Sequence, residues 1–327
     1  MKNVFKLWFI TLAVIIVYPA FAQTEGDFIV DLTKDESGVV IKGYTGSQRA
    51  VTIPAKIQGY PVKEISDEAF SSDGYVDLDF GMGDFRRGSG RTRTRLTSVT
   101  IPTGVERIGE NAFFTQRDLT SVNIPASVIS IGDGAFAGCS SLTTVNIPTS
   151  VSSIGNYAFF ECNKLATVNL SEGLVEIGGK AFAACSALKT IKLPNSLTNL
   201  GRYVFSNSGI TAVTFGTGLT VIPSYTFSYN SWGDYYGVPI KTIVIPEGVM
   251  GIGQSAFRGC SELTSVTLPS TLEIIGERAF SGCSALTTVT VPATLESVNF
   301  YEAVFVGCEK LLLATRAALK KLGWDGN

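Results

Sequence analysis

The sequence predicts a repeat solenoid, a right-handed superhelix of short strands and helical turns with a capped end on each side. The first observation is a phenylalanine that recurs with a period of 23 residues over the middle of the chain. The second is a proline after Ile, Leu or Val that keeps the same spacing. Fixed self-similarity at such a period indicates stacked structural repeats. The repeated phenylalanines are Phe70, Phe113, Phe136, Phe159, Phe182, Phe205, Phe227, Phe257, Phe280 and Phe305.

One repeat, residues 142–164, shows how a single coil is built. Val145 and Ile147 have the alternating spacing of a strand with one buried face. Pro148 ends this strand because proline cannot donate the next ladder hydrogen bond. A second short apolar run follows, VSSIG, and then a helical turn whose Phe159 fills the end of the coil. One coil cannot bury its own apolar face, so the coils are expected to stack.

The repeated pattern LxxVxIPxxVxxIGxxAFxxC resembles the BspA-like leucine-rich repeats, a short bacterial class, over residues 39–309. The pattern departs from the ordinary leucine-rich repeat at the position after the first strand, where an asparagine ladder is absent. That position holds Ser127, Ser150, Gly104 and Gly248. The resemblance implies a leucine-rich-repeat superhelix in an exported surface protein that binds other macromolecules. It brings no catalytic residues with it.

Residues 1–22 are predicted to be a signal peptide. A lysine-containing start precedes the apolar run Leu7–Tyr18, and Ala20 and Ala22 form a small-x-small cleavage site. The apolar run is shorter than the roughly 20 residues that span a bilayer, and we expect no transmembrane segment in the mature chain. Without its two leader lysines the chain has 24 basic and 28 acidic residues. This negative balance argues against nucleic acid and acidic membranes as partners.

The remaining chain divides into two caps and a repeat domain. Residues 23–50 form the N-terminal cap, a hairpin of Phe28–Leu32 and Val39–Tyr44 that covers the open edge of the first coil. Residues 51–309 form about ten repeat coils. Residues 310–327 are a capping helix and tail. The helix is predicted over Lys310–Leu322, with Leu312, Thr315, Leu319 and Leu322 on one side and Trp324 packed nearby.

Two insertions, residues 71–95 and 228–239, interrupt the period at the same point of the coil, after the phenylalanine turn. Insertions in repeat proteins lie on one face, which is often the binding face. Six coils at about 4.8 Å each separate their roots by about 29 Å. The plainest interpretation of the first insertion is a solvated polar loop, with contact to an acidic partner as the alternative. Exposed aromatics on the second insertion are typical binding anchors. The predicted partner-binding residues are Arg86, Arg87, Arg91, Arg93, Tyr229, Trp232, Asp234, Tyr235 and Tyr236.

The composition disfavours an enzyme. The chain has no histidine, which excludes nucleophilic sites of the Ser-His-Asp and Cys-His kinds and the commonest metal ligand. A carboxylate pair remains conceivable, but acids such as Glu106, Glu176 and Glu273 are scattered over polar repeat positions. We therefore expect no catalytic residues, no metal and no cofactor.

The six cysteines all lie three residues after a repeat phenylalanine. They occur in two runs of three adjacent coils. Disulfides between neighbouring coils would therefore leave one thiol in each run unpaired. Cysteine is also a small, readily buried apolar residue. We predict a ladder of buried free thiols, with disulfides as the alternative in an exported chain. The cysteines are Cys139, Cys162, Cys185, Cys260, Cys283 and Cys308.

The exposed positions of the first strands form a polar stripe in which Lys192 is the one charged residue. This stripe can reflect strand propensity and solubility, or a hydroxyl-rich binding surface. Its members are Ser121, Asn123, Thr144, Asn146, Thr167, Asn169, Thr190, Ser265, Thr267, Thr288 and Thr290.

The sequence as a whole favours a non-catalytic binding module, a secreted or cell-surface adhesin that contacts a protein or glycan on a host or bacterial surface. A periplasmic or envelope scaffold is the structural alternative, and a carbohydrate-active enzyme is the catalytic one. The oligomeric state stays open.

Overall fold

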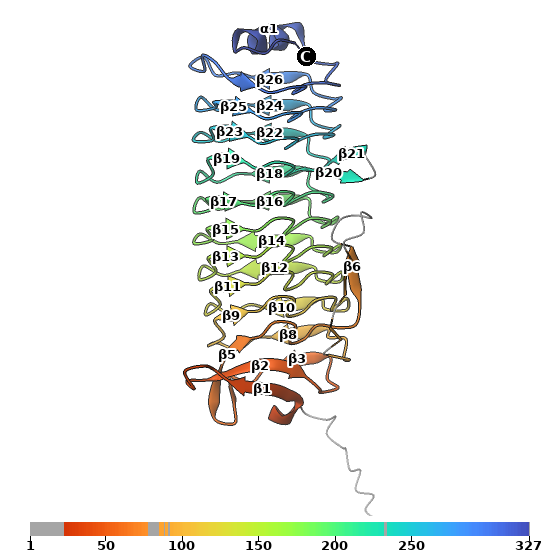
Figure 1. Cartoon of the computed structure of the whole chain (residues 1–327), viewed down its shortest axis with the longest axis vertical. Coiled ribbons are helices and arrows are strands. Elements are labelled where there is room, and N and C mark those ends of the chain that lie inside the picture. The colour runs from red at the N-terminus through yellow and green to blue at the C-terminus, as the bar shows by residue number, and fades with distance from the viewer. Residues whose placement is uncertain (1–22, 78–84, 88, 91, 232–233, 327) are drawn as a thin grey trace, which may run out of the picture.

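The computed structural model describes residues 23–326 except 78–84, 88, 91 and 232–233. The predicted signal peptide, Arg91 and Trp232 therefore lie outside the described residues. Figure 1 shows one elongated stack of coils, with the N-terminal hairpin at one end and a helix at the other. The predicted repeat solenoid is confirmed.

The first strand of each coil forms one long side of the stack. Ten such strands are described: β3 (Ala50–Thr52), β8 (Ser98–Thr100), β10 (Ser121–Asn123), β12 (Thr144–Ile147), β14 (Thr167–Leu170), β16 (Thr190–Lys192), β18 (Ala212–Thr214), β22 (Thr242–Val244), β24 (Ser265–Thr267) and β26 (Thr288–Thr290). Parallel pairing joins these strands into four short sheets, β3-β8-β10, β12-β14, β16-β18 and β22-β24-β26.

The second strand of each coil forms the opposite side. Its members are β5 (Tyr60–Ile65), β9 (Arg107–Ile108), β11 (Ser130–Ile131), β13 (Ser153–Ile154), β15 (Glu176–Ile177), β17 (Asn199–Leu200), β19 (Val221–Ile222), β23 (Gly251–Ile252), β25 (Ile274–Ile275) and β27 (Asn299–Phe300). This ladder is interrupted between β17 and β19. Gly201 donates its N–H to Ile177 one coil before, but Pro223 stands at the equivalent position of the next coil and has no N–H to donate.

Paired residues in neighbouring coils are separated by the period of the sequence repeat. In β12 and β14 each residue pairs with the residue 23 positions later, as in Val145 with Val168. Val145 and Ile147 are buried and the residues beside them are exposed, as the alternation predicts. Equivalent positions of the repeat are therefore brought one above another in neighbouring coils.

The repeat phenylalanines form a continuous column of rings through the core. Phe136, Phe159 and Phe182 are fully buried, and their neighbouring ring centroids are each 5.3 Å apart with nearly parallel planes. The column begins at Phe28 and Tyr44 in the N-terminal cap and ends where Trp324 meets Phe305 edge to face. The predicted role of the phenylalanine as the filling of the coil end is confirmed.

The segment around each phenylalanine is a series of tight turns, which differs from the helical turn predicted from the sequence. Tyr157 and Glu161 have left-handed φ values of 57° and 55°, and an α-helix cannot contain them. The backbone N–H of Phe159 bonds to Ala181 in the next coil instead of to its own turn. Hydrogen bonding between coils therefore replaces the intrahelical pattern.

Glycine is required where adjacent coils approach most closely. A Cβ on Gly155 would collide with the backbone nitrogen and carboxylate of Asp133 in the preceding coil. Only glycine permits this approach without moving the backbone. This accounts for the glycine that follows the second strand in most repeats.

Hydroxyl groups take the place of the asparagine ladder of ordinary leucine-rich repeats. Ser127, Ser150 and Ser196 donate to the carbonyl oxygens of Val105, Val128 and Leu174 in the preceding coil, at 2.7, 2.7 and 2.8 Å. Thr271 does the same to Val249 at 2.9 Å. Backbone carbonyls that leave the strand ladder are thereby satisfied.

At the N-terminal end, β1 (Phe28–Leu32) pairs antiparallel with β2 (Val39–Tyr44), and β2 pairs with β5 of the first coil. A short 3₁₀ helix, Glu25–Asp27, precedes β1. The strand β4 (Lys56–Ile57) turns back on β5 and lengthens the first coil.

At the C-terminal end, α1 spans Leu313–Lys321 and begins three residues later than predicted. Thr315, Leu319 and Leu322 are buried, but Leu312 is 55% exposed, so its predicted place on the buried side is wrong. Leu311 is buried instead, because the chain is still extended at Leu312 when it reaches the helix.

Candidate binding surface

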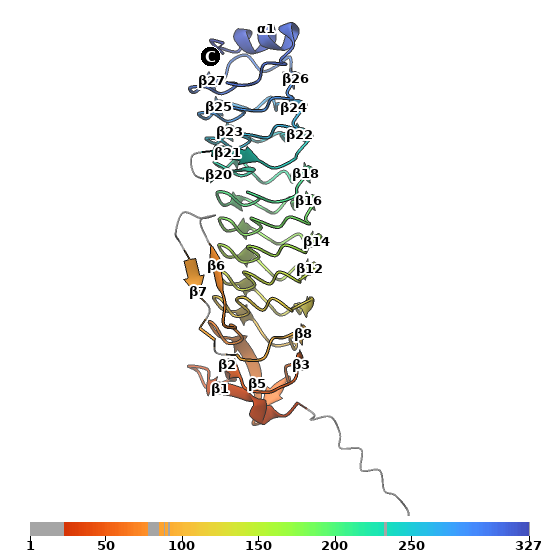
Figure 2. The ribbon, with the colours of Figure 1, turned by 90° about the vertical axis from the view of Figure 1, so that its right-hand side faces the viewer.

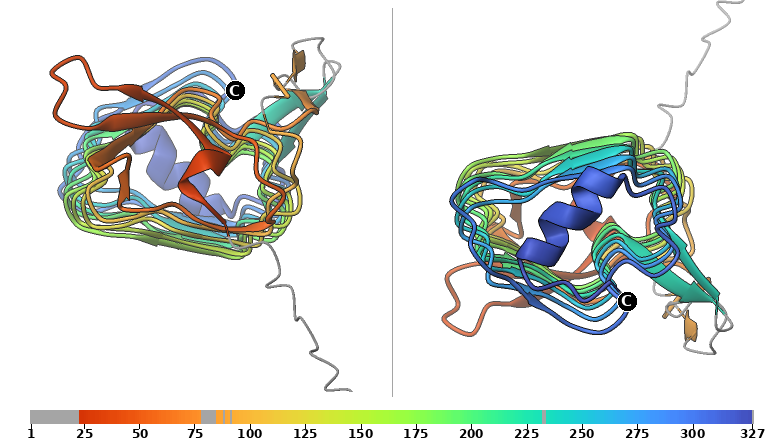
Figure 3. Two further views of the ribbon diagram at one scale, coloured as in Figure 1. Left: turned by 90° about the horizontal axis from the view of Figure 1, so that it is seen from below. Right: turned by 90° about the horizontal axis from the view of Figure 1, so that it is seen from above.

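Two hairpins protrude from the same corner of the stack, as both end views in Figure 3 show. The first pairs β6 (Tyr75–Asp77) with β7 (Phe85–Arg87), and the second pairs β20 (Ser228–Ser231) with β21 (Asp234–Gly237). Each follows the phenylalanine turn of its coil, after Phe70 and Phe227. We call these four strands together the hairpin corner.

The first hairpin is anchored against the stack. Val76 is 1% exposed and belongs to a small apolar cluster with Phe114, Ala137, Phe160 and Ala183, one residue from each of four successive coils. Figures 1 and 2 show β6 running along the stack axis from its root toward the second hairpin. A fully solvated loop is therefore the wrong interpretation for this part of the insertion.

Polar contacts hold the two ends of this insertion. The hydroxyl of Ser72 donates to the carbonyl oxygen of Thr115 at 2.7 Å, and the backbone N–H of Thr92 donates to Ser71 at 3.0 Å. Ser71, Ser72 and Thr92 are all buried. The insertion thus leaves and re-enters the stack at fixed points.

Three of the four predicted arginines lie in the described part of this insertion. Arg86 and Arg87 lie on β7, the strand paired with β6, and the structure describes their backbone. Arg93 lies on the returning segment and is exposed. Arg91 is outside the described residues. The antiparallel pairing places β7 on the same corner of the stack as the second hairpin (Figure 3).

The second hairpin carries the aromatic residues. The rings of Tyr229 and Tyr236 stack across its two strands with centroids 5.3 Å apart, and Tyr236 is 48% exposed. Partial burial, with a smaller contribution from Tyr236, raises the pKa of the Tyr229 phenol above its usual value. Asp234 and Tyr235 lie on β21, where the backbone is described. The hydroxyl of Ser228 fixes the base by donating to Ser255 at 2.6 Å.

A row of stacked aromatic and cationic side chains runs between the hairpins, and sequence reasoning did not find it. The rings of Tyr203 and Tyr225 are 4.6 Å apart and nearly parallel. Arg202 lies 5.3 Å from the Tyr225 ring, and Lys180 lies 5.4 Å from the Tyr157 ring and 5.6 Å from the Tyr203 ring. These distances allow cation–π attraction. We call these five residues the aromatic row.

Four of the five residues of the aromatic row come from one position of the repeat, two residues before the phenylalanine. Tyr157, Lys180, Tyr203 and Tyr225 all occupy it, with left-handed φ values between 55° and 60°. Such backbone directs one side chain per coil toward the same corner, where each meets the side chain of the next coil. The signal in the sequence was the aromatic or basic residue at this position, which a search for buried repeats overlooks.

The row is continuous with both hairpins. Tyr157 packs on the apolar cluster that anchors β6. At the other end, the backbone N–H of Ser228, the first residue of β20, donates to Tyr225 at 3.2 Å. The hairpin corner and the aromatic row therefore form one connected surface.

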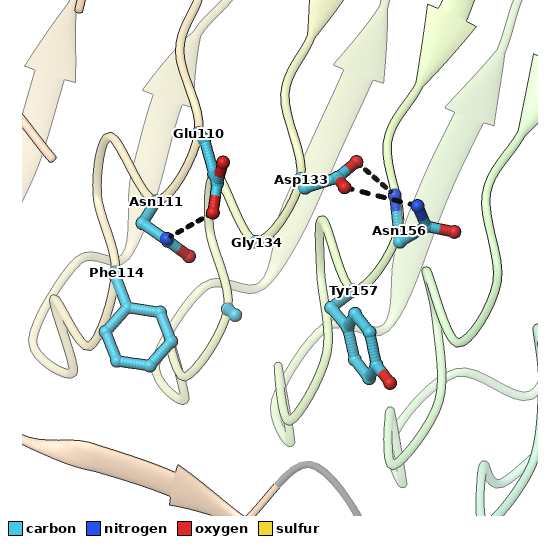
Figure 4. Close-up of a pocket in the computed structure, with 8 residues that line it drawn as sticks. Glu110, Asn111, Phe114, Asp133, Gly134, Asn156 and Tyr157 are labelled. Atoms are coloured by element: carbon cyan, nitrogen blue, oxygen red, sulfur yellow. Dashed lines mark hydrogen bonds between the residues drawn. The ribbon is translucent and has the colours of Figure 1, made fainter. Parts of the chain in front are cut away.

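Where the same position holds glycine, the row is replaced by a pocket of about 130 Å³, shown in Figure 4. Gly134 forms its floor with Ala137, between Asn111 of one neighbouring coil and Tyr157 of the other. Phe114 forms part of the wall. Glu110, Asp133 and Asn156 stand at the rim, each directly after the glycine that ends a second strand. We call this the Gly134 pocket.

Comparison with protein-family models decides the family. A model described as "BspA type Leucine rich repeat region (6 copies)" matches residues 49–139, 87–178, 106–232 and 233–316. These overlapping matches cover most of the chain. The chain belongs to the BspA-type leucine-rich repeat family.

Several solved structures resemble this BspA-type chain. A leucine rich cell surface protein from Faecalibacterium prausnitzii is 28% identical, with 88% of this chain and 86% of that one covered and a TM-score of 0.49. The T. pallidum leucine rich repeat protein is 27% identical over 93% and 97%, with a TM-score of 0.41. The pneumococcal vaccine antigen PcpA is 22% identical over 87% and 78%, with a TM-score of 0.56, and supports the fold. No curated protein matches the chain.

The BspA-type repeat also explains the cysteines. All six are free and buried in the structure, as predicted. Each thiol donates to the carbonyl oxygen of the phenylalanine one coil before, for example Cys162 to Phe136 at 3.3 Å and Cys283 to Phe257 at 3.2 Å. Burial raises the pKa of the Cys162 and Cys283 thiols and raises that of Cys185 to about 12. The thiolate, which is the reactive form, is therefore disfavoured at these three positions, whereas the hydrogen bond with Cys283 lowers the pKa of the Cys308 thiol.

The first-strand side of the BspA-type stack is a flat array of small polar side chains. Thr144 and Asn146 are exposed on β12, Thr167 and Asn169 repeat them on β14, and the two asparagine side chains bond to each other at 2.7 Å. Internal hydrogen bonding stabilises this array, and its role as a binding surface stays a prediction.

Within the described ranges, no group of three or more Cys, Asp or Glu side chains is placed to hold a metal ion. The same part of the chain contains no helix long and apolar enough to cross a membrane.

Proposed function

We propose that this BspA-type protein is a non-catalytic recognition module, an adhesin that acts at the cell surface or after secretion and binds a protein or glycan. The observation that carries the proposal is the connected surface formed by the hairpin corner and the aromatic row. Its partner-contacting residues would be Arg86, Arg87, Arg91, Arg93, Tyr229, Trp232, Asp234, Tyr235 and Tyr236, together with the aromatic row.

The chemistry of this surface supports recognition. Tyrosine, tryptophan and arginine are the residues that contribute most binding energy at protein interfaces. Tyr236 is 48% exposed and rests on the Tyr229 ring, so little conformational entropy is lost when it is covered. The roots of the two hairpins are about 29 Å apart at ~4.8 Å per coil. A macromolecule suits such a span better than a small molecule held in one pocket.

The N-terminal sequence supports a location at the cell surface or outside the cell. Residues 1–22 have the charged start, apolar run and small-x-small site of a signal peptide. Six free thiols in an exported protein are tolerable because each is buried and therefore shielded from reagents in solution. The protein needs no disulfide for stability, since stacked coils supply a continuous apolar core.

A binding screen tests the proposal. Mature protein, residues 23–327, would be applied to arrays of extracellular-matrix proteins, host glycans and bacterial surface polysaccharides, beside a variant in which residues 228–239 are replaced by a connection of regular repeat length. We expect at least one protein or glycan to bind the intact protein and to lose most of its binding to the variant.

Two further measurements separate the alternatives. Protease added to intact cells should cleave the protein if it is exposed, and full protection would favour an envelope scaffold. Release of reducing ends from any polysaccharide on the array would favour a carbohydrate-active enzyme.

A further inference from the structure

The Gly134 pocket is a gap in an otherwise filled column. The position two residues before the phenylalanine carries a side chain in the neighbouring coils, Asn111 before it and Tyr157 after it. Gly134 shares their left-handed backbone, with φ of 60°. A Cβ there would collide with the Oδ1 atom of Asn111. The missing side chain therefore leaves the space beside the amide oxygen unfilled.

The amide of Asn111 is held in one orientation. Its side-chain nitrogen donates to the Glu110 carboxylate at 3.1 Å. Turning the amide over would place its oxygen against that carboxylate, which cannot donate when ionised. Figure 4 shows the oxygen pointing away from Glu110, toward Gly134. Asn111 is only 6% exposed, and its Oδ1 has no hydrogen-bond partner among the described residues.

A buried oxygen without a donor is costly, by roughly 1–3 kcal/mol. A buried acceptor without a partner in a native structure calls for an explanation, and one explanation is a ligand that donates a hydrogen bond to it. Asn111 lines the Gly134 pocket, so a donor inside the pocket would lie beside this oxygen.

Two further polar groups of the pocket, Asp133 and Glu110, are carboxylates. The Asp133 carboxylate accepts the backbone N–H of Asn156 at 2.7 Å and its side-chain N–H at 3.2 Å, which fixes its position at the rim. A carboxylate has about four acceptor sites, so Asp133 retains capacity for a further donor. Glu110 adds a second carboxylate, and no lysine or arginine lines the pocket. The pocket therefore combines two negative charges with an unsatisfied amide oxygen.

The aromatic walls of the Gly134 pocket also favour a cationic group. The rings of Tyr157 and Phe114 line the pocket, and Tyr157 already attracts one cation, Lys180, at 5.4 Å. Aromatic rings beside carboxylates favour a cation with an apolar stem, such as a guanidinium or ammonium on an alkyl chain. The volume of about 130 Å³ suits the end of one such side chain rather than a whole small molecule, whose pockets are roughly 300–1,000 Å³.

We propose that the Gly134 pocket binds a basic side chain, arginine or lysine, from the partner of this protein. The cation would donate to Asn111 Oδ1 and the Asp133 carboxylate and lie against the Tyr157 ring. This inference rests on the proposed function, since it assumes a protein partner. It refines that function by placing an arginine- or lysine-bearing segment beside the first hairpin.

The test is a titration of isotope-labelled mature protein with N-acetyl-arginine methylamide, followed by NMR of the Asn111 side-chain amide and the Gly134 backbone amide. We expect both signals to shift, with a dissociation constant on the order of millimolar. The lysine analogue should act similarly, and the citrulline analogue, which has the same shape without the charge, should not.

Variants locate the site. Asp133→Asn keeps the acceptor of the Asn156 N–H and removes one charge, so it should weaken arginine binding about fivefold or more, as expected for loss of a charge-assisted bond. Asn111→Gly removes the amide and tolerates the left-handed backbone. Glu277→Gln is the matched control, because Glu277 occupies the register of Asp133 in a distant coil. It should leave the dissociation constant unchanged.

Three outcomes would overturn the proposal. The first is equal shifts with citrulline or with a neutral hexose, which would indicate a neutral ligand. The second is unchanged binding by Asp133→Asn and Asn111→Gly. The third is arginine binding that appears only in the Arg86→Ala/Arg87→Ala variant, which would show that this chain fills its own pocket. None of these results depends on the array screen, so failure here and failure of the proposed function are distinguishable.

Discussion

Replacement of Phe159 by alanine should be one of the most destabilising single changes in this protein. Phe159 is fully buried and lies between Phe136 and Phe182, with both ring centroids 5.3 Å away. Truncation of a buried phenylalanine costs roughly 3–5 kcal/mol. The two lost ring pairs, about 0.5–1.5 kcal/mol each, place the expected loss near the upper end of that range.

The position of Phe159 in the middle of the stack adds a second expectation. Each coil contacts only its neighbours, so a weakened interface can uncouple the coils on its two sides. Urea unfolding followed by circular dichroism should show a lower free energy of unfolding and a broader or two-step transition. Tyr301→Ala is the control, because Tyr301 is 58% exposed and its loss should stay within about 0.5 kcal/mol.

A loss below about 1.5 kcal/mol for Phe159→Ala, well short of the range for a buried phenylalanine, would refute the reasoning. It would mean that the ring column does not carry the core. An equal loss for Tyr301→Ala would point to a general effect of removing aromatic residues.

Three other predictions follow from the same geometry. In denaturant without reductant, the protein should react with about six equivalents of a thiol reagent, one for each cysteine, and with few when native; no reaction after unfolding would establish disulfides. Replacement of residues 228–239 by a regular connection should leave the melting temperature nearly unchanged, because the remaining coils keep their neighbours; a large fall would make the hairpin structural. Asp67→Asn should destabilise the protein near neutral pH, by less than about 1 kcal/mol for so exposed a group, and the difference from wild type should vanish as pH falls below about 4.

The sign of the last effect comes from the surroundings of Asp67. Partial burial acts to raise the pKa of its carboxyl, but the backbone N–H of Glu110 and the guanidinium of Arg107, each 2.8 Å away, lower it overall. A depressed pKa means that the carboxylate stabilises the fold above the pKa of the unfolded chain. That contribution is lost as the carboxyl becomes protonated. A difference that persists unchanged at pH 2.5, well below the ordinary carboxyl pKa of about 4, would contradict this account.

The architecture could be predicted from the sequence because the repeat pattern strongly restricts the possible arrangements of the strands. The alternation of Val145 and Ile147, the proline after them and the phenylalanine period each admit one register, and the strands pair 23 residues apart as that period requires. The position of the cysteines relative to the phenylalanine was also enough to predict buried thiols, since every member of a repeat register shares one environment.

Features that depend on the exact backbone were not predictable. Tyr157 and Gly134 hold left-handed backbone at the same repeat position, and no pattern of apolar residues reports φ. The helix α1 begins later than its periodicity suggested, because Leu311 rather than Leu312 turns inward before the first helical residue. Side-chain spacing alone cannot locate such a transition.

The binding surface was predictable only in part. Both insertions were visible as breaks in the period, and their common point of departure predicted a common side. The packing of Val76 across four coils was not visible, because one apolar residue in a polar insertion gives no periodic signal. The aromatic row was equally hidden, since Tyr203 and Tyr225 become neighbours only when coils stack.

Hydrogen–deuterium exchange of the mature protein, with and without its strongest-binding array partner, tests most directly whether the hairpin corner is the recognition surface. We predict slower exchange in β6, β7, β20 and β21 and in the turns that carry Tyr203 and Tyr225. Protection confined to the first-strand side, in β12, β14, β24 and β26, with the hairpins unchanged, would contradict that claim and assign binding to the polar array.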